Sequence, residues 1–353
     1  MKQSDVKHSL IFHIGAHRTA TSAVQEYLHG NIPALKQLGF LYPFMTRRHV
    51  HMINQLFNGA RSPQQVSADL VERIKAHDMD LHSVVLSDED ICMRQDISLL
   101  GEFKNKFNVK VVFSLRRQDL WLESWYLQNI KWQWNPRLSH CTLPEFLRLR
   151  EEFHWIHYDR YVRHLEKVFG RENVILTLYE PGQMPPGGAV QMFCDSIGLQ
   201  PTADFVSPAR VNPSFSPQVS EFMRCLPLDA APEKYRAMLT AACAEIDSQA
   251  RRQQALLQQG EQGPPLLIPH GQREAIMAKY ARGNRALARR YFDREALFLD
   301  PLPEPGTPLT EMGLPSDSYQ LMTEFVAPLL QAMIRRRRQE VGRKTAPKST
   351  SST

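Results

Sequence analysis

The sequence predicts an α/β protein with a central parallel sheet flanked by helices and a mostly helical C-terminal half. Four short apolar runs, at 9–14, 83–87, 109–115 and 173–179, have the length and continuous hydrophobicity of buried strands. Helical stretches separate these runs, and such alternation is typical of a parallel sheet covered on both faces. After about residue 180 the chain continues as helices joined by proline-rich segments.

One helix is expected after the first strand, because apolar residues recur at three- and four-residue spacing from about Thr21 to Leu38. Pro33 allows this helix only with a kink or a break, and Gly39 ends it. Further along, the pattern predicts a surface helix over 245–262, an irregular segment over 300–317 and a helix over 318–338.

The basic character of the chain is confined to its end. The formal net charge is +6, and residues 335–353 hold seven basic residues against one acid, which accounts for all of it. We therefore expect one domain over 1–334 and a basic, disordered tail over 335–353. The neutral body argues against nucleic acid as a partner. The four arginines at 335–338 allow a weak contact with a membrane surface.

The composition indicates a cytoplasmic protein that needs no metal. The five cysteines are scattered and odd in number, as in a reducing compartment. The sequence has no apolar run of membrane-spanning length, and its first residues are too polar for a signal peptide. His49 and His51 lie close together, but a pair without a third ligand is a weak metal signal.

The loop after the first strand is a candidate anion site. It reads GAHRTATS over 15–22 and offers a glycine, a cation and three hydroxyls. It opens a helix, whose N-terminal N–H groups and dipole attract phosphate or sulfate. The Gly-Lys-Ser/Thr ending of a Walker A loop is absent, which disfavours Mg²⁺–ATP. A Ser or Thr that merely caps the helix is the structural alternative. The candidate binding residues are His17, Arg18, Thr19, Ala20, Thr21 and Ser22.

A second candidate follows the strand at 109–115. Arg116 comes directly after this strand, and Ser124 lies on the helix that follows. A guanidinium fork and a hydroxyl at this spacing can converge on one oxyanion. Alternatively, Arg116 and Arg117 pair with Asp119 or Glu123 at the surface.

The two loops together resemble the sulfotransferases that use 3′-phosphoadenosine 5′-phosphosulfate, particularly their bacterial branch. That family has a Lys-Thr-Gly-Thr-Thr-like loop for the 5′-phosphosulfate, and HIGAHRTATSAVQEYL is similar to it. It also has an Arg followed eight residues later by a Ser, both for the 3′-phosphate, which Arg116 and Ser124 match. Family-like stretches at 31–43, 86–90, 210–224 and 280–292 extend the resemblance over about residues 8–300.

The resemblance implies a P-loop NTPase-like fold and sulfuryl transfer to a hydroxyl or amine, for example of a glycan, a glycolipid or a small molecule. Arg210 and Asn212 are expected to reach the nucleotide or to order the loop that covers it. Two positions depart from the family, because Arg18 replaces a lysine and Ala20 a glycine. Arginine needs more room than lysine, and alanine narrows the backbone conformations open to the loop. We expect both changes to be tolerated, with slow or absent turnover as the alternative.

The general base is left open between three residues. The family uses His or Glu, and His51 is our first candidate, because it follows the first helix and the LYP turn. Glu89 is the second, since strand ends line the crevice in this fold class, and His49 is the third. Among the tryptophans, Trp121 and Trp125 are predicted to be core, whereas an exposed pair, Trp132 and Trp134, suits a stacked sugar.

Two other functions compete with the sulfotransferase hypothesis. One is a P-loop-like nucleotide kinase, which the missing Walker ending disfavours. The other is a non-catalytic nucleotide or polyanion binder that uses the arginines at 335–338. Deletion of 335–353 would abolish the main function only in the second case.

Overall fold

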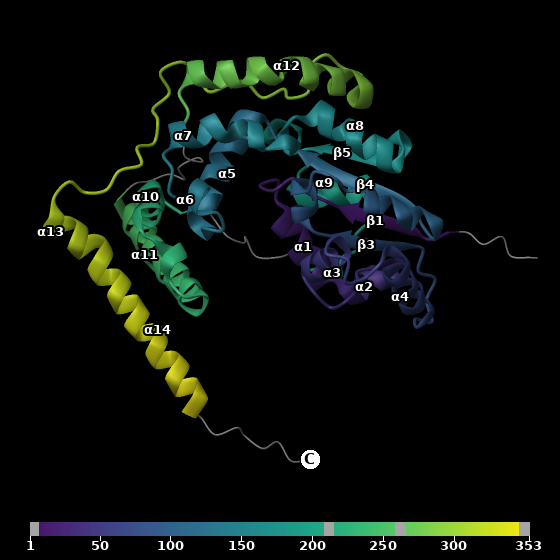
Figure 1. Cartoon of the computed structure of the whole chain (residues 1–353), viewed down its shortest axis with the longest axis horizontal. Helices are drawn as coiled ribbons and strands as arrows, with labels where there is room; N and C mark the ends of the chain where they lie inside the picture. The colour runs from purple at the N-terminus through teal and green to yellow at the C-terminus, as the bar shows by residue number, and fades with distance from the viewer. Residues whose placement is uncertain (1–6, 208–214, 258–265, 346–353) are drawn as a thin grey trace, which may run out of the picture. The chain divides into compact units, whose positions relative to one another are not determined.

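The computed structural model describes residues 7–207, 215–257 and 266–345. Its sheet has five parallel strands in the order β2-β3-β1-β4-β5. This confirms the predicted α/β class with a central parallel sheet (Figure 1). Four strands lie where the apolar runs predict them, and β2 escaped prediction because two residues show no pattern. The bounds are β1 (Ser9–His13), β2 (Phe40–Leu41), β3 (Ser83–Ser87), β4 (Asn108–Leu115) and β5 (Val174–Leu178).

Helices connect the strands and form the C-terminal half. The single helix expected over 21–38 is two helices, with the break at Asn31, two residues before Pro33. The segment 300–317 is irregular, as predicted. The α-helices are α1 (Thr21–Gly30), α2 (Ile32–Gln37), α3 (Val50–Phe57), α4 (Pro63–Lys75), α5 (Gln118–Trp132), α6 (Pro136–Ser139), α7 (Leu143–Arg148), α8 (Tyr158–Phe169), α9 (Gly188–Ile197), α10 (Pro217–Cys225), α11 (Glu233–Leu257), α12 (His270–Phe292), α13 (Ser318–Leu321) and α14 (Ala327–Thr345).

The chain divides into two compact units. The first contains the sheet and comprises 1–121, 150–212 and 270–304. One sheet face packs through Ile11 against α1, α2 and α9. The other packs through Phe12, whose ring centroid is 5.5 Å from that of Phe103 and 6.4 Å from that of Phe169 in α8. The apolar strands are thus covered on both faces.

The second unit comprises 122–149, 213–269 and 305–353, and it is helical wherever it has regular structure in its described part. There α14 packs on α11, and Arg335 contacts Glu245 at 2.6 Å. The domain boundary expected at 334 stays a prediction. It falls within α14, which continues to Thr345, so residues 335–345 of the expected disordered tail are helical. Within the described ranges, no helix is both long and apolar enough to cross a membrane.

Candidate functional site

The two predicted anion-binding loops lie side by side, because β1 and β4 are neighbours whose carboxyl ends meet at one sheet edge. Arg116 Nη1 donates a hydrogen bond to the carbonyl oxygen of Arg18 at 2.8 Å. The Arg116 guanidinium also lies over the ring of Tyr179, which follows β5, 5.4 Å from its centroid. Three strand ends therefore bring two cations and a tyrosine together.

The charges of Arg18 and Arg116 act on each other. Burial, the largest cause, and the positive charge of Arg116 together lower the pKa of Arg18 to about 10, while Tyr179 opposes the shift. Two guanidinium groups held near each other repel, and an anion between them relieves that repulsion. The arrangement suits a ligand with phosphate or sulfate groups.

The loop that carries Arg18 has a fixed, partly strained backbone. Arg18 and Ala20 adopt left-handed φ angles of 66° and 61°, where glycine is favoured. The Thr19 hydroxyl donates to the Ala16 carbonyl oxygen at 2.6 Å. Ala20 is the N-cap of α1, with no side-chain capping bond, so neither Thr21 nor Ser22 has the capping role of the structural alternative. The first turn of α1 contains no acid that would repel an anion.

Arg117 has the structural role considered as the alternative. It donates to Asp119 at 2.8 Å, in a buried position rather than at the surface. Asp119 also accepts from Arg273 of α12 at 2.8 Å. Gln118 and Asn284 exchange two amide hydrogen bonds, at 2.8 and 3.0 Å. Segment 270–304 thus holds the turn that follows β4.

The remaining candidates for nucleotide binding lie elsewhere or outside the description. Ser124 is buried on α5, the helix that begins two residues after Arg116. This helix passes from the first unit into the second after Trp121, and Ser124 belongs to the second. Arg210 and Asn212 lie outside the described residues. Their roles stay predictions.

The two histidine candidates for the base differ in their surroundings. His51 is exposed on α3, with its Nε2 atom 3.1 Å from Nε2 of Gln55. His49 is buried, and its Nδ1 accepts from the Ser87 N–H at 3.0 Å. Its Nε2 must then carry the ring hydrogen, which points to the Pro43 carbonyl oxygen at 3.0 Å. Burial lowers the pKa of His49 to about 4. The His49 ring is therefore committed to holding the backbone.

Glu89 lies against the start of the anion-binding loop. It opens the short 3₁₀ helix η1 (Glu89–Met93) after β3, and 8% of its surface is exposed. Gly15 has a φ of +89°, and a Cβ atom there would lie 3.0 Å from the Cβ of Glu89. Arg48 Nε is 3.5 Å from Glu89 Oε2. Among the three base candidates, Glu89 is the residue whose Cα and Cβ atoms lie next to Gly15 of the loop.

The acids around Glu89 share Arg48, which sequence analysis did not single out. Arg48 Nη2 contacts carboxylate oxygens of Asp88 and Asp90, both at 2.5 Å. Burial disfavours the charged guanidinium, but the three carboxylates outweigh it and raise the pKa of Arg48. Burial also raises the pKa of Asp88 to about 6, although Arg48 opposes this. The acidic run LSDED at 86–90 was the available signal for this cluster.

His17 anchors the loop to the same cluster. Its Nε2 lies 3.0 Å from Asp90 Oδ1. Burial opposes ionisation of Asp90, but His17 and Arg48 outweigh it and lower the pKa of Asp90. His17 is therefore placed to orient the loop through Asp90. In the described part of the chain, His, Cys, Asp and Glu form no group of three or more arranged to hold a metal ion.

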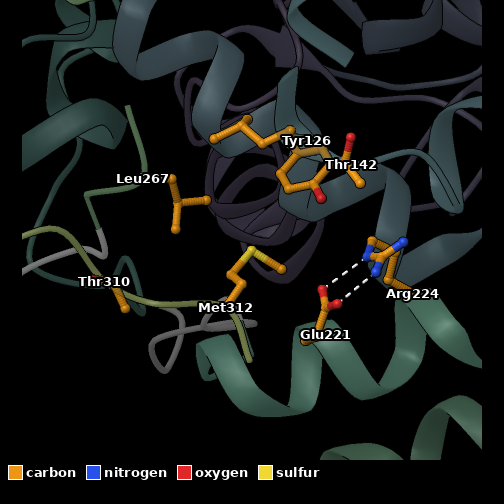
Figure 2. A pocket seen from close by; sticks show the side chains of 8 residues that line it. Tyr126, Thr142, Glu221, Arg224, Leu267, Thr310 and Met312 are labelled. Atoms are coloured by element: carbon orange, nitrogen blue, oxygen red, sulfur yellow. Dashed lines mark hydrogen bonds and ion pairs between the residues drawn. The ribbon is translucent and has the colours of Figure 1, made fainter. Parts of the chain in front are cut away.

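The second unit holds a pocket of its own, about 250 Å³ in volume. Figure 2 shows the paired side chains of Glu221 and Arg224 along one side, with Leu267 across from them and Met312 between. In the same unit Trp132 and Trp134 are exposed and stacked, with ring centroids 5.9 Å apart. Their use by an acceptor stays a prediction.

Comparisons with known proteins give slight likenesses. The chain matches no protein-family model. An uncharacterized protein of Archaeoglobus fulgidus is 25% identical over 211 residues, which are 58% of this chain and 52% of that protein. The chain thus spans about half the length of this curated relative. The crystal structure of a sulfotransferase from Alicyclobacillus acidocaldarius covers 57% of this chain and 86% of its own, at 18% identity and a TM-score of 0.38. At that score the likeness assigns neither family nor function.

Proposed function

We propose that this chain is a sulfotransferase that moves the sulfuryl group of 3′-phosphoadenosine 5′-phosphosulfate to a hydroxyl or amine of an acceptor. The observation that carries the proposal is the convergence of Arg18 and Arg116 beside the N-terminus of α1. The resemblance of both loops to sulfotransferase motifs supplies the chemistry. A donor with anionic groups at its 5′ and 3′ positions needs two such cations.

Each residue then has a defined task. Arg18 and the first turn of α1 hold the 5′-phosphosulfate and stabilise the charge that grows on the leaving phosphate. Arg116 and Ser124 bind the 3′-phosphate. The protein mainly positions donor and acceptor, as in phosphoryl transfer. The acceptor class stays as the sequence predicts, a glycan, a glycolipid or a small molecule.

In this proposal Glu89 is the general base. A carboxylate next to the loop can take the proton of an acceptor hydroxyl as the oxygen attacks sulfur. The contact of Glu89 with Gly15 supports this choice over His51. We expect Glu89→Gln to lower kcat by about 10²–10⁴-fold and to leave nucleotide binding intact. The exposed His51→Gln is measured beside it. Loss of transfer in His51→Gln alone would return the role to the histidine.

The function itself is tested by titration with 3′-phosphoadenosine 5′-phosphate. One charged hydrogen bond contributes about 1.5–3 kcal/mol, so Arg116→Ala should weaken binding by roughly 10- to 100-fold. AMP lacks the 3′-phosphate and should bind both proteins alike. Arg163→Ala, at an exposed arginine of α8, is the matched control and should change neither ligand. Equal losses for both nucleotides, or a preference for Mg²⁺–ATP, would contradict the proposal.

A further inference from the structure

A chain of buried side chains runs from the sheet to Glu89. His13 Nδ1, at the end of β1, lies 2.8 Å from Ser87 Oγ, at the end of β3. Gln25 of α1 donates from Nε2 to Ser87 Oγ at 3.2 Å and to Glu89 Oε2 at 2.5 Å. Gln25 is fully buried, and the other three residues are at most 8% exposed. The contact between Gln25 and Glu89 is therefore shielded from water.

The Gln25 amide presents its donor side to Ser87 and Glu89. Its two N–H groups are both on Nε2, which faces the two acceptors. Its Oε1 is buried and has no hydrogen-bond partner in the described structure. The reversed amide would place Oε1 against the carboxylate, and two acceptors at that distance repel. The amide thus donates to Glu89 while its own Oε1 makes no hydrogen bond in the described structure.

The hydrogen bond from Gln25 matters to Glu89 because the neighbouring cation is shared with other carboxylates. Its cationic contact is Arg48, which Asp88 and Asp90 share. His13 supplies no charge, because burial lowers its pKa to about 4 although Glu89 opposes the shift. Among the described residues, the titratable and charged groups that interact with Glu89 are Arg48, His13, Asp88, Tyr42 and Cys92, and the neighbouring Asp90 shares Arg48 with it.

We infer that Gln25 is a positioning residue that holds the Glu89 carboxylate in one orientation. This inference rests on the proposed function. In the transfer step, the acceptor oxygen bonds to sulfur, the bond from sulfur to the 5′-phosphate oxygen breaks, and Glu89 takes the acceptor proton. Gln25 touches none of the reacting atoms and acts through Glu89.

The test replaces Gln25 by Met, which has a similar length and no amide. We expect kcat to fall about 10-fold, with affinity for 3′-phosphoadenosine 5′-phosphate within about twofold of wild type. The acidic limb of kcat/KM should move up by about one pH unit, since the ionised carboxylate loses a donor. Gln25→Glu keeps the shape, sets a second carboxylate against Glu89, and should move the limb further. Thr177→Val removes a buried hydrogen bond of β5 and should lower Tm without moving the limb.

A double-mutant cycle decides whether Gln25 acts through Glu89. In a Glu89→Gln background, Gln25→Met should cost no further activity. If the activity losses of Glu89→Gln and Gln25→Met multiply in the double variant, or if the acidic limb of the kcat/KM profile does not move in Gln25→Met, the inference is overturned. The proposed function is not affected by either result. An NMR titration of the Glu89 carboxyl carbon separates the two ideas if wild type transfers nothing. Absence of transfer in wild type would refute the proposed function. A higher titration midpoint of Glu89 in Gln25→Met would still support the contact between Gln25 and Glu89, and an unchanged midpoint would overturn it.

Discussion

Acidification from pH 7 to pH 5 should destabilise the unit that contains the sheet by about 2 to 3 kcal/mol. Burial lowers the pKa values of His13 and His49 to about 4, from 6.5. Between pH 6.5 and pH 4 the two histidines bind protons in the unfolded chain but not in the folded chain. The free energy of unfolding therefore falls as the pH falls. Each histidine then costs about 2 kcal/mol by pH 5.

Asp88 works in the opposite direction. Burial raises its pKa from 3.8 to about 6, so the folded chain binds this proton first and gains about 1 kcal/mol by pH 5. The two histidines outweigh it, which leaves the net loss stated above. The pKa of Asp90 is lowered, so the stability that this group adds is lost at lower pH still.

Urea unfolding at pH 7, 6 and 5 measures this loss, with the free energy extrapolated to water. Tryptophan fluorescence follows the unfolding, to which the buried Trp121 and Trp155 contribute from this unit and the other three tryptophans from the second. In His13→Gln the loss between pH 7 and pH 5 should shrink to below about 1 kcal/mol, because one of the two protons is removed. The exposed His51→Gln should keep the wild-type pH dependence. An equal loss in His13→Gln and wild type would refute the reasoning.

Two predictions concern the strained loop. Ala20→Gly should stabilise the protein by about 0.5–1 kcal/mol, because φ is +61° there, whereas Ala23→Gly inside α1 should destabilise it by a similar amount. Thermal unfolding compares the two, and equal effects would contradict the assignment of strain. Arg18→Ala should reduce sulfuryl transfer far more than nucleotide affinity, and Arg18→Lys should keep or raise transfer. Radiolabelled-donor assays measure this, and an inactive Arg18→Lys would exclude the proposed role.

The parts of the fold that sequence predicts are those with a local cause. Strand β3 lies at the predicted residues, because a continuous apolar run between polar segments has few other solutions. The helix break near Pro33 follows from its missing N–H and fixed φ. The division into two units was not predictable, because the chain passes between them several times without a change in composition.

The same distinction between local and long-range causes holds for the residues of the candidate site. Arg18 and Arg116 were predictable as neighbours, since both follow parallel strands. Gln25 was not, because its partner Glu89 lies 64 residues away, and only packing reveals the contact. The prediction of His51 as the base rests on its position in the sequence, which does not indicate whether the side chain is buried or exposed. In the structure it is exposed, and Glu89 lies against the loop.

The hydrogen bond from Arg273 to Asp119, by which segment 270–304 holds the turn after β4, has a consequence for protein synthesis. A ribosome completes all five strands, and the residues of the Arg18–Arg116 pair, before residue 180. Arg273, which shares Asp119 with Arg117, emerges about a hundred residues later. The strands can pair on the nascent chain while this turn still lacks its buried partner, but the unit that contains the sheet is complete only when residues 270–304 have been added. Chains released early would thus carry the sheet but hold Asp119 with half of its pairing. The turn after β4 is therefore expected to gain its buried partner only late in translation, when residues 270–304 have been added.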